Sequence, residues 1–222
     1  MSIILNIETA LSTAFVSISR DGSMLQHLTN TLQKEHASFL HPAIKEILKN
    51  TKLQTRDIDA IAVSGGPGSY TGLRVGFAAA KGLCYALGKP LICISTLAVM
   101  AQAAQLAMRE ETGYLYCPMI DARRTEVFTA LYSAVGVEIF PPYAMLLDNS
   151  SFTAELQSNK ILFSGSGAIK FQKICTHENA HFAHIESSVE AMNILSVQKF
   201  RQKEFADTVN STPLYVKEFY VG

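Results

Sequence analysis

The chain has 222 residues, and its 19 basic and 19 acidic side chains give a formal net charge of zero. Hydrophobic residues make up 48% of the chain and charged residues 17%, which excludes an intrinsically disordered protein, since disorder needs low hydrophobicity and high net charge. A nucleic-acid-binding protein that acts alone usually carries a basic excess, which this chain lacks. So little charge on an apolar-rich chain suggests that a partner covers part of its surface.

The apolar segments and the cysteines indicate in which cellular compartment the protein is expected. No apolar run is long enough to cross a bilayer, and the first twenty residues lack the basic region and the cleavage site of a secretory signal. The cysteines are isolated in or beside apolar segments, with no CxxC pair, which predicts buried free thiols in a reducing compartment. We therefore expect a cytoplasmic protein without membrane contact. The cysteines are Cys84, Cys93, Cys117 and Cys175.

The first hundred residues predict strands and helices in the order β-β-β-α-β-α-β-α. Strands are predicted at residues 3–7, 13–19 and 24–31, with Asp21-Gly22 as a hairpin turn, and apolar residues recur at helical spacing over residues 34–50. Three antiparallel strands followed by crossovers to parallel ones are typical of a ribonuclease-H-like lobe with a mixed sheet. The remaining predicted elements are strands at 58–63 and 91–94 and helices at 73–87 and 97–108.

The second half has a less regular pattern. Strands are predicted at residues 115–120 and 125–132, and a short strand at 161–163 precedes Gly165-Ser166-Gly167. Residues 189–200 predict a helix. We expect an α/β protein of two lobes. The lobes are an N-terminal one at residues 1–109 and a smaller C-terminal one at residues 110–222.

A glycine-rich loop joins the strand at 58–63 to the helix at 73–87. Backbone amides at a helix N-terminus bind anions, and glycine lets a ligand or another chain approach closely. However, no Lys-Ser/Thr follows at Walker spacing, and Thr71 stands where the dinucleotide fingerprint has its third glycine. The loop is therefore either an anion site or a tight turn with Ser69 or Thr71 as the helix N-cap. Its residues are Gly65, Gly66, Pro67, Gly68, Ser69, Thr71 and Gly72.

The helix after this loop carries small residues every four positions, at Gly72, Gly76 and Ala80. A stripe of small residues allows another helix to pack very closely. Two partners for this stripe remain open, the chain's own helix at residues 34–50 and a second subunit.

Four segments in chain order together resemble one family. The stretches GPGSYTGLRVG and DARR are specific when they occur together. The segments are residues 4–9 (ILNIET), 61–83 (IAVSGGPGSYTGLRVGFAAAKGL), 119–128 (MIDARRTEVF) and 213–217 (PLYVK). Through them the chain resembles the TsaB family, also called YeaZ, of threonylcarbamoyladenosine biosynthesis. The resemblance implies an actin/Hsp70/sugar-kinase-type fold (ASKHA) of two ribonuclease-H-like lobes with mixed sheets.

The resemblance also implies a function and partners. A separate enzyme makes threonylcarbamoyl-AMP, the paralogous metalloenzyme TsaD transfers the group to the adenosine beside the anticodon of ANN-decoding tRNAs, and the ATPase TsaE joins them. TsaB-like proteins are described as non-catalytic subunits. We therefore expect a heterodimer with TsaD, a contact with TsaE, a homodimer when the chain is alone, and only indirect contact with tRNA.

The resemblance implies that a metal site has been lost. The catalytic paralog carries an HxxxH pair after the strand that follows its glycine-loop helix, and those two places fall on Thr96 and Met100 here. Neither side chain binds a divalent metal as imidazole does. His177, His181 and His184 would share one side of a helix and suggest another metal site, but the segment favours a strand at least equally, with His181 and His184 on opposite faces.

The resemblance also places a vestigial nucleotide cleft in this chain. Fold relatives that hydrolyse ATP have an aspartate followed by a small, glycine-rich turn in both phosphate loops. Arg123 and Arg124 follow Asp121 here, and they either grip an anion of a neighbouring subunit or form a surface turn with a salt bridge to Asp121 or Glu126. We expect no cofactor bound by this chain alone, with ATP and magnesium left open at a subunit interface. The cleft residues are Glu8, Thr9, Asp121, Arg123, Arg124, Gly165 and Gly167.

The partner-binding surface is predicted on the helices at 34–50 and 72–87, which would pack on the matching pair of TsaD as a four-helix bundle. Arginine in place of Ala79 is expected to abolish that contact. The predicted interface residues are His36, Leu40, Ile44, Leu73, Arg74, Gly76, Phe77, Ala80 and Lys81.

Two other functional classes stay open. The first is an independent enzyme of the same fold, either an ATP- or metal-dependent phosphotransferase or a glycoprotease-like hydrolase, although neither a Gly-x-Ser-x-Gly elbow nor a catalytic triad spacing is present. The second is an RNA-binding module, which would need the basic stripe and interleaved aromatic residues that this chain lacks.

Overall fold

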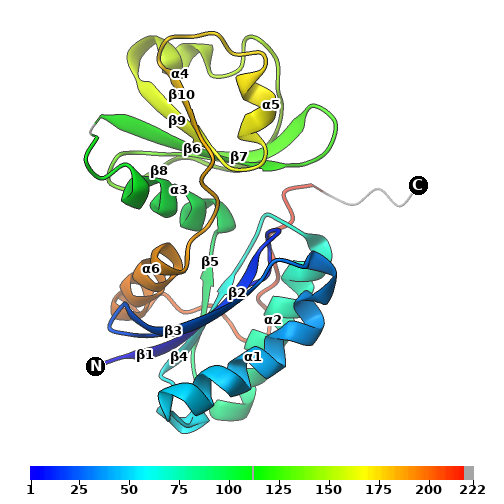
Figure 1. Ribbon diagram of the computed structural model, residues 1–222, viewed down its shortest axis with the longest axis vertical. Coiled ribbons are helices and arrows are strands. Elements are labelled where there is room, and N and C mark those ends of the chain that lie inside the picture. Colours follow the sequence, from blue (N-terminus) through cyan, green and yellow to red (C-terminus); the bar gives the residue numbers. More distant parts are fainter. Residues whose placement is uncertain (112, 218–222) are drawn as a thin grey trace. The chain divides into compact units, whose positions relative to one another are not determined.

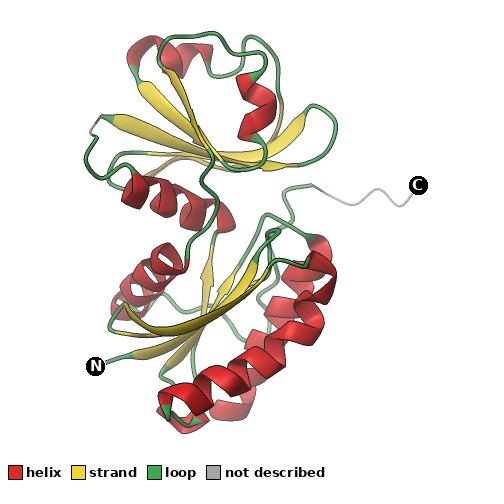
Figure 2. Ribbon diagram, in the orientation of Figure 1, coloured by secondary structure: helices red, strands yellow, loops and turns green. Residues whose placement is uncertain are grey.

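The computed structural model describes residues 1–111 and 113–217, which form two compact α/β units (Figure 2). Unit 1 contains Met1–Thr96 and Val189–Leu214, and unit 2 contains Leu97–Ser188 with the segment that begins at Tyr215. This division differs from the two contiguous lobes that we expected, 1–109 and 110–222. The reason is packing, because the helix at 189–202 packs on the strands of unit 1.

Unit 1 is built on a mixed five-stranded sheet in the order β3-β2-β1-β4-β5. The first three strands are antiparallel, and β4 and β5 run parallel to β1, as the sequence predicted for a ribonuclease-H-like lobe. The strands are β1 (Ile3–Glu8), β2 (Ala14–Arg20), β3 (Ser23–Asn30), β4 (Ala60–Ser64) and β5 (Leu91–Ile94).

Helices cover both faces of this sheet. Figure 1 shows α1 (His36–Thr51) and α2 (Tyr70–Leu87) side by side on one face and α6 (Val189–Gln202) on the other. Between α1, α2 and the sheet lies a core of aliphatic side chains, such as Ile7 and Ile47, with no exposed area. Because burying such a side chain contributes about 2 kcal/mol, this core fixes both helices on the sheet.

Unit 2 has a second five-stranded sheet, in the order β10-β9-β6-β7-β8. Its core is aromatic, with Phe152, Phe163 and Phe171 packed edge to face. Figure 1 shows α4 and α5 over one face of this sheet and α3 along the other. The elements are β6 (Tyr114–Asp121), β7 (Glu126–Tyr132), β8 (Glu138–Leu146), β9 (Lys160–Ser164), β10 (Ala180–Ala183), α3 (Thr96–Ala107), α4 (Thr153–Ser158) and α5 (Ala168–Gln172).

The two sheets share one topology. Numbered within its own unit, each sheet has the strand order 3-2-1-4-5, with two antiparallel pairings and then two parallel ones. This shared strand order confirms the prediction of two ribonuclease-H-like lobes, although the sequence shows no internal repeat.

Two further predictions concern the thiols and the membrane. The four cysteines are free, as expected; Cys84 and Cys117 are buried, whereas Cys93 and Cys175 are half-buried. Within the described parts of the chain, none of the helices combines the length and apolarity needed to cross a bilayer.

Candidate functional site

The glycine loop turns the chain from β4 into α2 and is tied on both sides. Gly65 N donates to Ile94 O at 2.6 Å, and Thr96 N donates to Gly66 O at 2.9 Å. The predicted N-cap is Ser69, whose hydroxyl accepts from Gly72 N at 3.3 Å. The loop therefore forms a tight strand-to-helix turn with Ser69 as the N-cap of α2.

The two glycines of the small-residue stripe of α2 pack against a part of the chain that the sequence did not suggest. A Cβ at Gly72 would collide with Thr9 O, and one at Gly76 would collide with Thr9 Oγ1. The Thr9 hydroxyl also donates to Gly72 O at 2.7 Å. The bare backbone is therefore needed because α2 lies directly against the turn that follows β1.

The turn after β1 encloses the carboxyl group of Glu8. This side chain has no exposed area, and its Oε1 accepts from Ala10 N at 2.6 Å. Its Oε2 accepts a short hydrogen bond from the Ser64 hydroxyl at the end of β4. The carbonyl side of the turn faces the other way, since Ala10 O accepts from Ser69 N at 2.7 Å. The turn is thus held between the start of α2 and its own acidic side chain.

Burial dominates the ionisation of Glu8. It raises the pKa of the carboxyl from 4.5 to about 7, although hydrogen bonds from Ser64 and from the amides of Ala10, Leu11 and Thr9 act in the opposite direction. None of these influences comes from a charged group. At neutral pH the carboxyl is therefore divided between its neutral and its ionised form.

The corresponding turn in unit 2 follows β6 and carries Asp121 at the surface. Asp121 Oδ1 accepts from Arg123 N and from Lys170 Nζ, both at 2.6 Å. Burial raises the pKa of Asp121, but the hydrogen bonds from Lys170 and Arg123 outweigh it and hold the pKa below 3.8. Lys217 pairs with Glu126 at 2.5 Å.

The two arginines of this turn form none of the salt bridges that we predicted. Both are exposed and take left-handed backbone angles, with φ of 73° at Arg123 and 47° at Arg124. Asp121 pairs with Lys170, and Glu126 pairs with Lys217, instead. In the described part of unit 2, neither arginine has an ion-pair partner.

Gly165 and Gly167 bring the loop after β9 against β6. Gly167 N donates to Met119 O at 2.9 Å, and a Cβ at Gly165, where φ is 92°, would collide with Met100 Cε. These two glycines belong to unit 2 with Asp121, Arg123 and Arg124, whereas Glu8 and Thr9 belong to unit 1. The residues predicted to form one cleft therefore belong to two different units.

The places of the HxxxH pair are closed. Thr96 has no exposed area and Met100 is 1% exposed, so both side chains are packed in protein interior. His181 lies on strand β10, with its ring edge to face against Tyr114 at 5.0 Å, so the strand alternative for this segment is confirmed. Across residues 1–111 and 113–217, no group of three His, Cys, Asp or Glu side chains is placed to hold a metal ion.

Most of the predicted interface residues lie inside unit 1. The aliphatic and aromatic ones build the core beneath the two helices, and Lys81 Nζ donates to Val209 O and Ser211 O, both at 2.9 Å. Arg74 is exposed, with its guanidinium 4.6 Å from the centre of the Tyr70 ring. The buried members are His36, Leu40, Ile44, Leu73, Gly76, Phe77 and Ala80.

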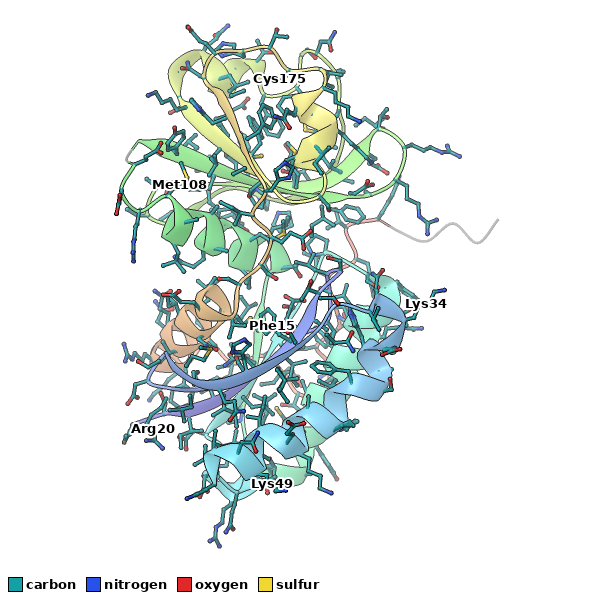
Figure 3. The ribbon with its side chains drawn as sticks, viewed as in Figure 1. Phe15, Arg20, Lys34, Lys49, Met108 and Cys175 are labelled. Atoms are coloured by element: carbon teal, nitrogen blue, oxygen red, sulfur yellow. The ribbon has the colours of Figure 1, made fainter. Side chains whose placement is uncertain are left out.

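The outer surface of α2 consists of other residues. Ala79, proposed above as an interface position, is 8% exposed, while its neighbour Ala78 is exposed. Ala78 and Gly82 are one turn apart, and Tyr85 beside them is 86% exposed. The exposed face of α1 lies alongside, with Lys34 and Lys49 near its two ends (Figure 3).

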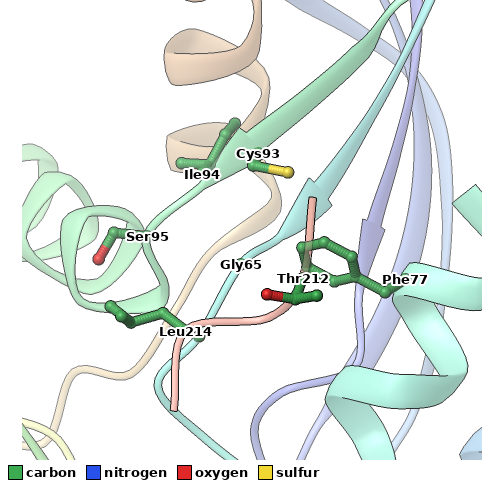
Figure 4. Close-up of a pocket in the computed structure, with 8 residues that line it drawn as sticks. Gly65, Phe77, Cys93, Ile94, Ser95, Thr212 and Leu214 are labelled. Atoms are coloured by element: carbon green, nitrogen blue, oxygen red, sulfur yellow. The ribbon is translucent and has the colours of Figure 1, made fainter. Parts of the chain in front are cut away.

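A small cavity of about 190 Å³ lies in unit 1 where residues 212–214 cross the glycine loop (Figure 4). Leu214 N donates to Gly65 O at 2.7 Å, which holds this crossing in place. Burial raises the pKa of the Cys93 thiol in its wall to about 11, so the thiol stays protonated and unreactive at neutral pH. The lining residues are Gly65, Gly66, Phe77, Cys93, Ile94, Ser95, Thr212 and Leu214.

Sequence reasoning missed two residues that bind the Glu8 carboxyl. It identified Glu8 but neither Ser64, which donates to it, nor Ala10, whose amide holds it. The strand pairing was the available signal. Because β1 and β4 were both predicted to be buried and parallel, residues at their ends should meet.

Comparisons with known proteins show the family to which the sequence belongs. Residues 28–217 match the family described as TsaD, tRNA N6-adenosine threonylcarbamoyltransferase. A Bacillus subtilis (strain 168) protein named tRNA threonylcarbamoyladenosine biosynthesis protein TsaB is 33% identical over 73% of this chain and 70% of its own length. An Escherichia coli (strain K12) protein of the same name is 36% identical over 58% of this chain and 54% of its own length.

A solved structure shows the same fold. A Pseudomonas aeruginosa protein described as uncharacterized, with similarity to peptidase YeaZ, superposes with a TM-score of 0.83 over 98% of this chain and 100% of its own, at 24% identity. Its fold supports the two-lobed arrangement of mixed sheets, and the sequence matches supply the family. The chain is therefore a member of the TsaB family, also called YeaZ, of tRNA threonylcarbamoyladenosine biosynthesis proteins, and it has the actin/Hsp70/sugar-kinase-type fold.

Proposed function

We propose that this chain is a non-catalytic subunit that acts with TsaD and TsaE in transferring threonylcarbamoyl to the adenosine beside the anticodon of ANN-decoding tRNAs. The observation that carries the proposal is the pair Thr96 and Met100. They stand at the places of a metal-binding HxxxH pair, are buried, and neither side chain binds a divalent ion as imidazole does. Transfer chemistry at a metal would then belong to the partner.

The exposed faces of α1 and α2 are the proposed surface for TsaD, and for a second copy of this chain when TsaD is absent. The small side chains of Ala78 and Gly82 allow a partner helix to come close, and Tyr85 supplies the large apolar contact that protein interfaces favour. Arg74, placed over Tyr70, adds a cation at the edge of the same face.

Reconstitution tests the role. Purified TsaD, TsaE, the enzyme that makes threonylcarbamoyl-AMP, and an ANN-decoding tRNA are combined with and without this chain, and modified adenosine is quantified. We expect modification only when the chain is present, and equal modification in its absence would reject the proposal. Calorimetry of the chain alone with Mg-ATP and with zinc is a second test. Tight stoichiometric binding of either would favour an independent enzyme.

One substitution tests the surface. Ala78→Arg places a long charged side chain in the middle of the proposed contact, and we expect it to reduce co-purification with TsaD at least about 100-fold, as loss of a central interface contact does. The matched control is Gln198→Arg, an exposed position on α6, which covers the opposite face of the sheet. If Ala78→Arg binds TsaD as Gln198→Arg does, the surface is not the interface.

A further inference from the structure

The segment that follows α6 crosses unit 1 as a strap, residues 203–214. The structure describes all of these residues, and none of their side chains is buried; Val209, near the middle, is 77% exposed. An element without buried apolar side chains depends on its hydrogen bonds, and such elements open locally at a lower free energy than the core does. We therefore expect the strap to open more readily than the sheet on which it lies.

Backbone hydrogen bonds hold the two ends of the strap. Ala206 N donates to Leu91 O at 2.8 Å, which is an isolated pairing with the start of β5. Leu214 N donates to Gly65 O in the glycine loop at 2.7 Å. Between these two points the strap makes no regular pairing with β5, so its middle needs another contact.

A lysine of α2 supplies that contact. Lys81 Nζ donates to Val209 O and to Ser211 O, both at 2.9 Å. The Asp207 carboxylate shapes the turn that carries these carbonyls, because it accepts from Val209 N at 2.7 Å and from Asn210 N at 3.0 Å. Hydrogen bonds from a charged donor are stronger than neutral ones, so Lys81 is the main attachment of the middle of the strap.

The strap forms one wall of the cavity of about 190 Å³ in unit 1. Thr212 and Leu214 line it from the strap, and Cys93 and Ile94 of β5 and Phe77 of α2 line it from the body of the unit (Figure 4). One wall therefore consists of a segment without any buried side chain. The Cys93 thiol, in the other wall, is half-buried.

We propose that the middle of the strap lifts from β5 and the glycine loop while its ends stay attached, that this opening admits large molecules to the cavity, and that Lys81 is the latch that keeps the strap closed. The ends stay attached because α6 packs on the sheet of unit 1 and because Lys217, three residues after the strap, pairs with Glu126 at 2.5 Å. The inference does not depend on the proposed role with TsaD.

The rate at which Cys93 reacts reports the opening. The full chain is treated with fluorescein maleimide, whose fluorescein group is too large for the closed cavity, and the labelling of each cysteine is followed by peptide mass spectrometry. Cys84, 2% exposed in the core of the same unit, reports unfolding of unit 1. We expect Cys93 to react at least about 100-fold faster than Cys84, because local opening needs less free energy than unfolding.

The latch is tested with Lys81→Met, which keeps the apolar stem and deletes both hydrogen bonds. It should speed the reaction of Cys93 roughly tenfold and leave Cys84 unchanged. Burial raises the pKa of Cys93, whereas Lys199 and Lys81 lower it. Loss of the Lys81 charge would by itself slow the thiol, so a faster reaction reports opening rather than thiol chemistry.

Two further variants make the result decisive. Asp207→Ala disrupts the turn from within the strap and should also speed Cys93 alone, whereas Lys45→Met, at an exposed lysine of α1, should react as wild type does. The proposal is overturned if Cys93 reacts no faster than Cys84 in wild type. It is also overturned if Lys81→Met and Asp207→Ala leave the rate of Cys93 unchanged, or if they speed Cys93 and Cys84 by the same factor.

Discussion

The turns after β1 and β6 hold the same place in two sheets of identical strand order, yet their carboxyl groups have opposite surroundings. Val63 pairs with Ile7, so Glu8 comes level with Ser64 at the end of β4, inside the unit. Ser164 pairs with Pro118, three residues before Asp121, so β6 extends further and delivers its carboxyl to the surface. The longer β6 thus places its carboxyl at the surface beside Lys170, where the pKa is lowered, whereas the carboxyl at the end of β1 is buried and its pKa is raised.

The largest expected effect comes from separating the turn after β1 from α2. Gly72→Ala would place a Cβ against Thr9 O. Because the Cβ is attached to the helix backbone and Thr9 O is itself a backbone atom, neither can move aside without a large energetic cost. We expect a loss of more than about 3 kcal/mol in the free energy of unfolding, measured by urea denaturation. Gly82→Ala on the same helix meets no atom within 4 Å and should be neutral or stabilising by about 0.5–1 kcal/mol. Equal losses in both variants would contradict the close approach.

The ionisation of the two carboxyls gives the next effect. A raised pKa means that the stabilising contribution of Glu8 is fully present below pH 4.5 and is lost as the pH rises through about 7. Glu8→Gln, which stays neutral, should match wild type at about pH 4.5 and exceed its stability by on the order of 3 kcal/mol at about pH 9. Thermal unfolding across this range measures the difference.

Asp121→Asn is the matched variant in unit 2 and should behave in the opposite way. The pKa of Asp121 is lowered, so its contribution is present above pH 3.8 and is lost only as the pH falls further. Because 45% of its side chain is exposed, the loss at neutral pH should stay below about 1 kcal/mol. If the difference in stability between Glu8→Gln and wild type does not change with pH, burial does not control the pKa of Glu8.

A smaller effect than that of Glu8→Gln distinguishes the two serines that end β4 and β9. Ser64 donates to Glu8, so Ser64→Ala should cost about 1–2 kcal/mol. The Ser164 hydroxyl is buried and finds no hydrogen-bond partner among residues 1–111 and 113–217, so Ser164→Ala should change stability by less than about 0.5 kcal/mol. If both substitutions lower the free energy of unfolding equally in chemical denaturation, the hydrogen bond from Ser64 to Glu8 does not distinguish the two strand ends.

The sequence predicted unit 1 closely because local patterns and packing agree there. The strand at 91–94 was predicted with its observed bounds, and α2 was predicted from residue 73 although it begins three residues earlier, at Tyr70. In unit 2 the edge strand β8 carries two consecutive prolines in FPPY, which obscured its period of two. The short helices α4 and α5 fall below the length at which helical spacing can be recognised.

The site was harder to predict because its determinants are tertiary. Gly72 and Gly76 suggested a close helix contact from their spacing, but only the fold shows that the contact is with Thr9, a residue more than sixty positions earlier. Likewise Lys170, rather than either adjacent arginine, pairs with Asp121, since α5 carries it there. The spacing of residues in the sequence shows where a close contact or an ion pair is expected. Which residue makes that contact depends on how the crossover connections fold.

The return of α6 to unit 1 has a consequence for synthesis. Asn193 on α6 accepts from Asn6 Nδ2 at 2.9 Å and from the Ser17 hydroxyl at 2.8 Å, so the helix closes one face of the first sheet with buried polar contacts as well as apolar ones. A ribosome releases residues 1–96 long before it makes this helix, and all of residues 97–188 emerge in between. Residues 97–188 of unit 2 can thus fold first, while one face of the nascent sheet of unit 1 stays uncovered, and a message truncated before Val189 would yield a chain that never covers it.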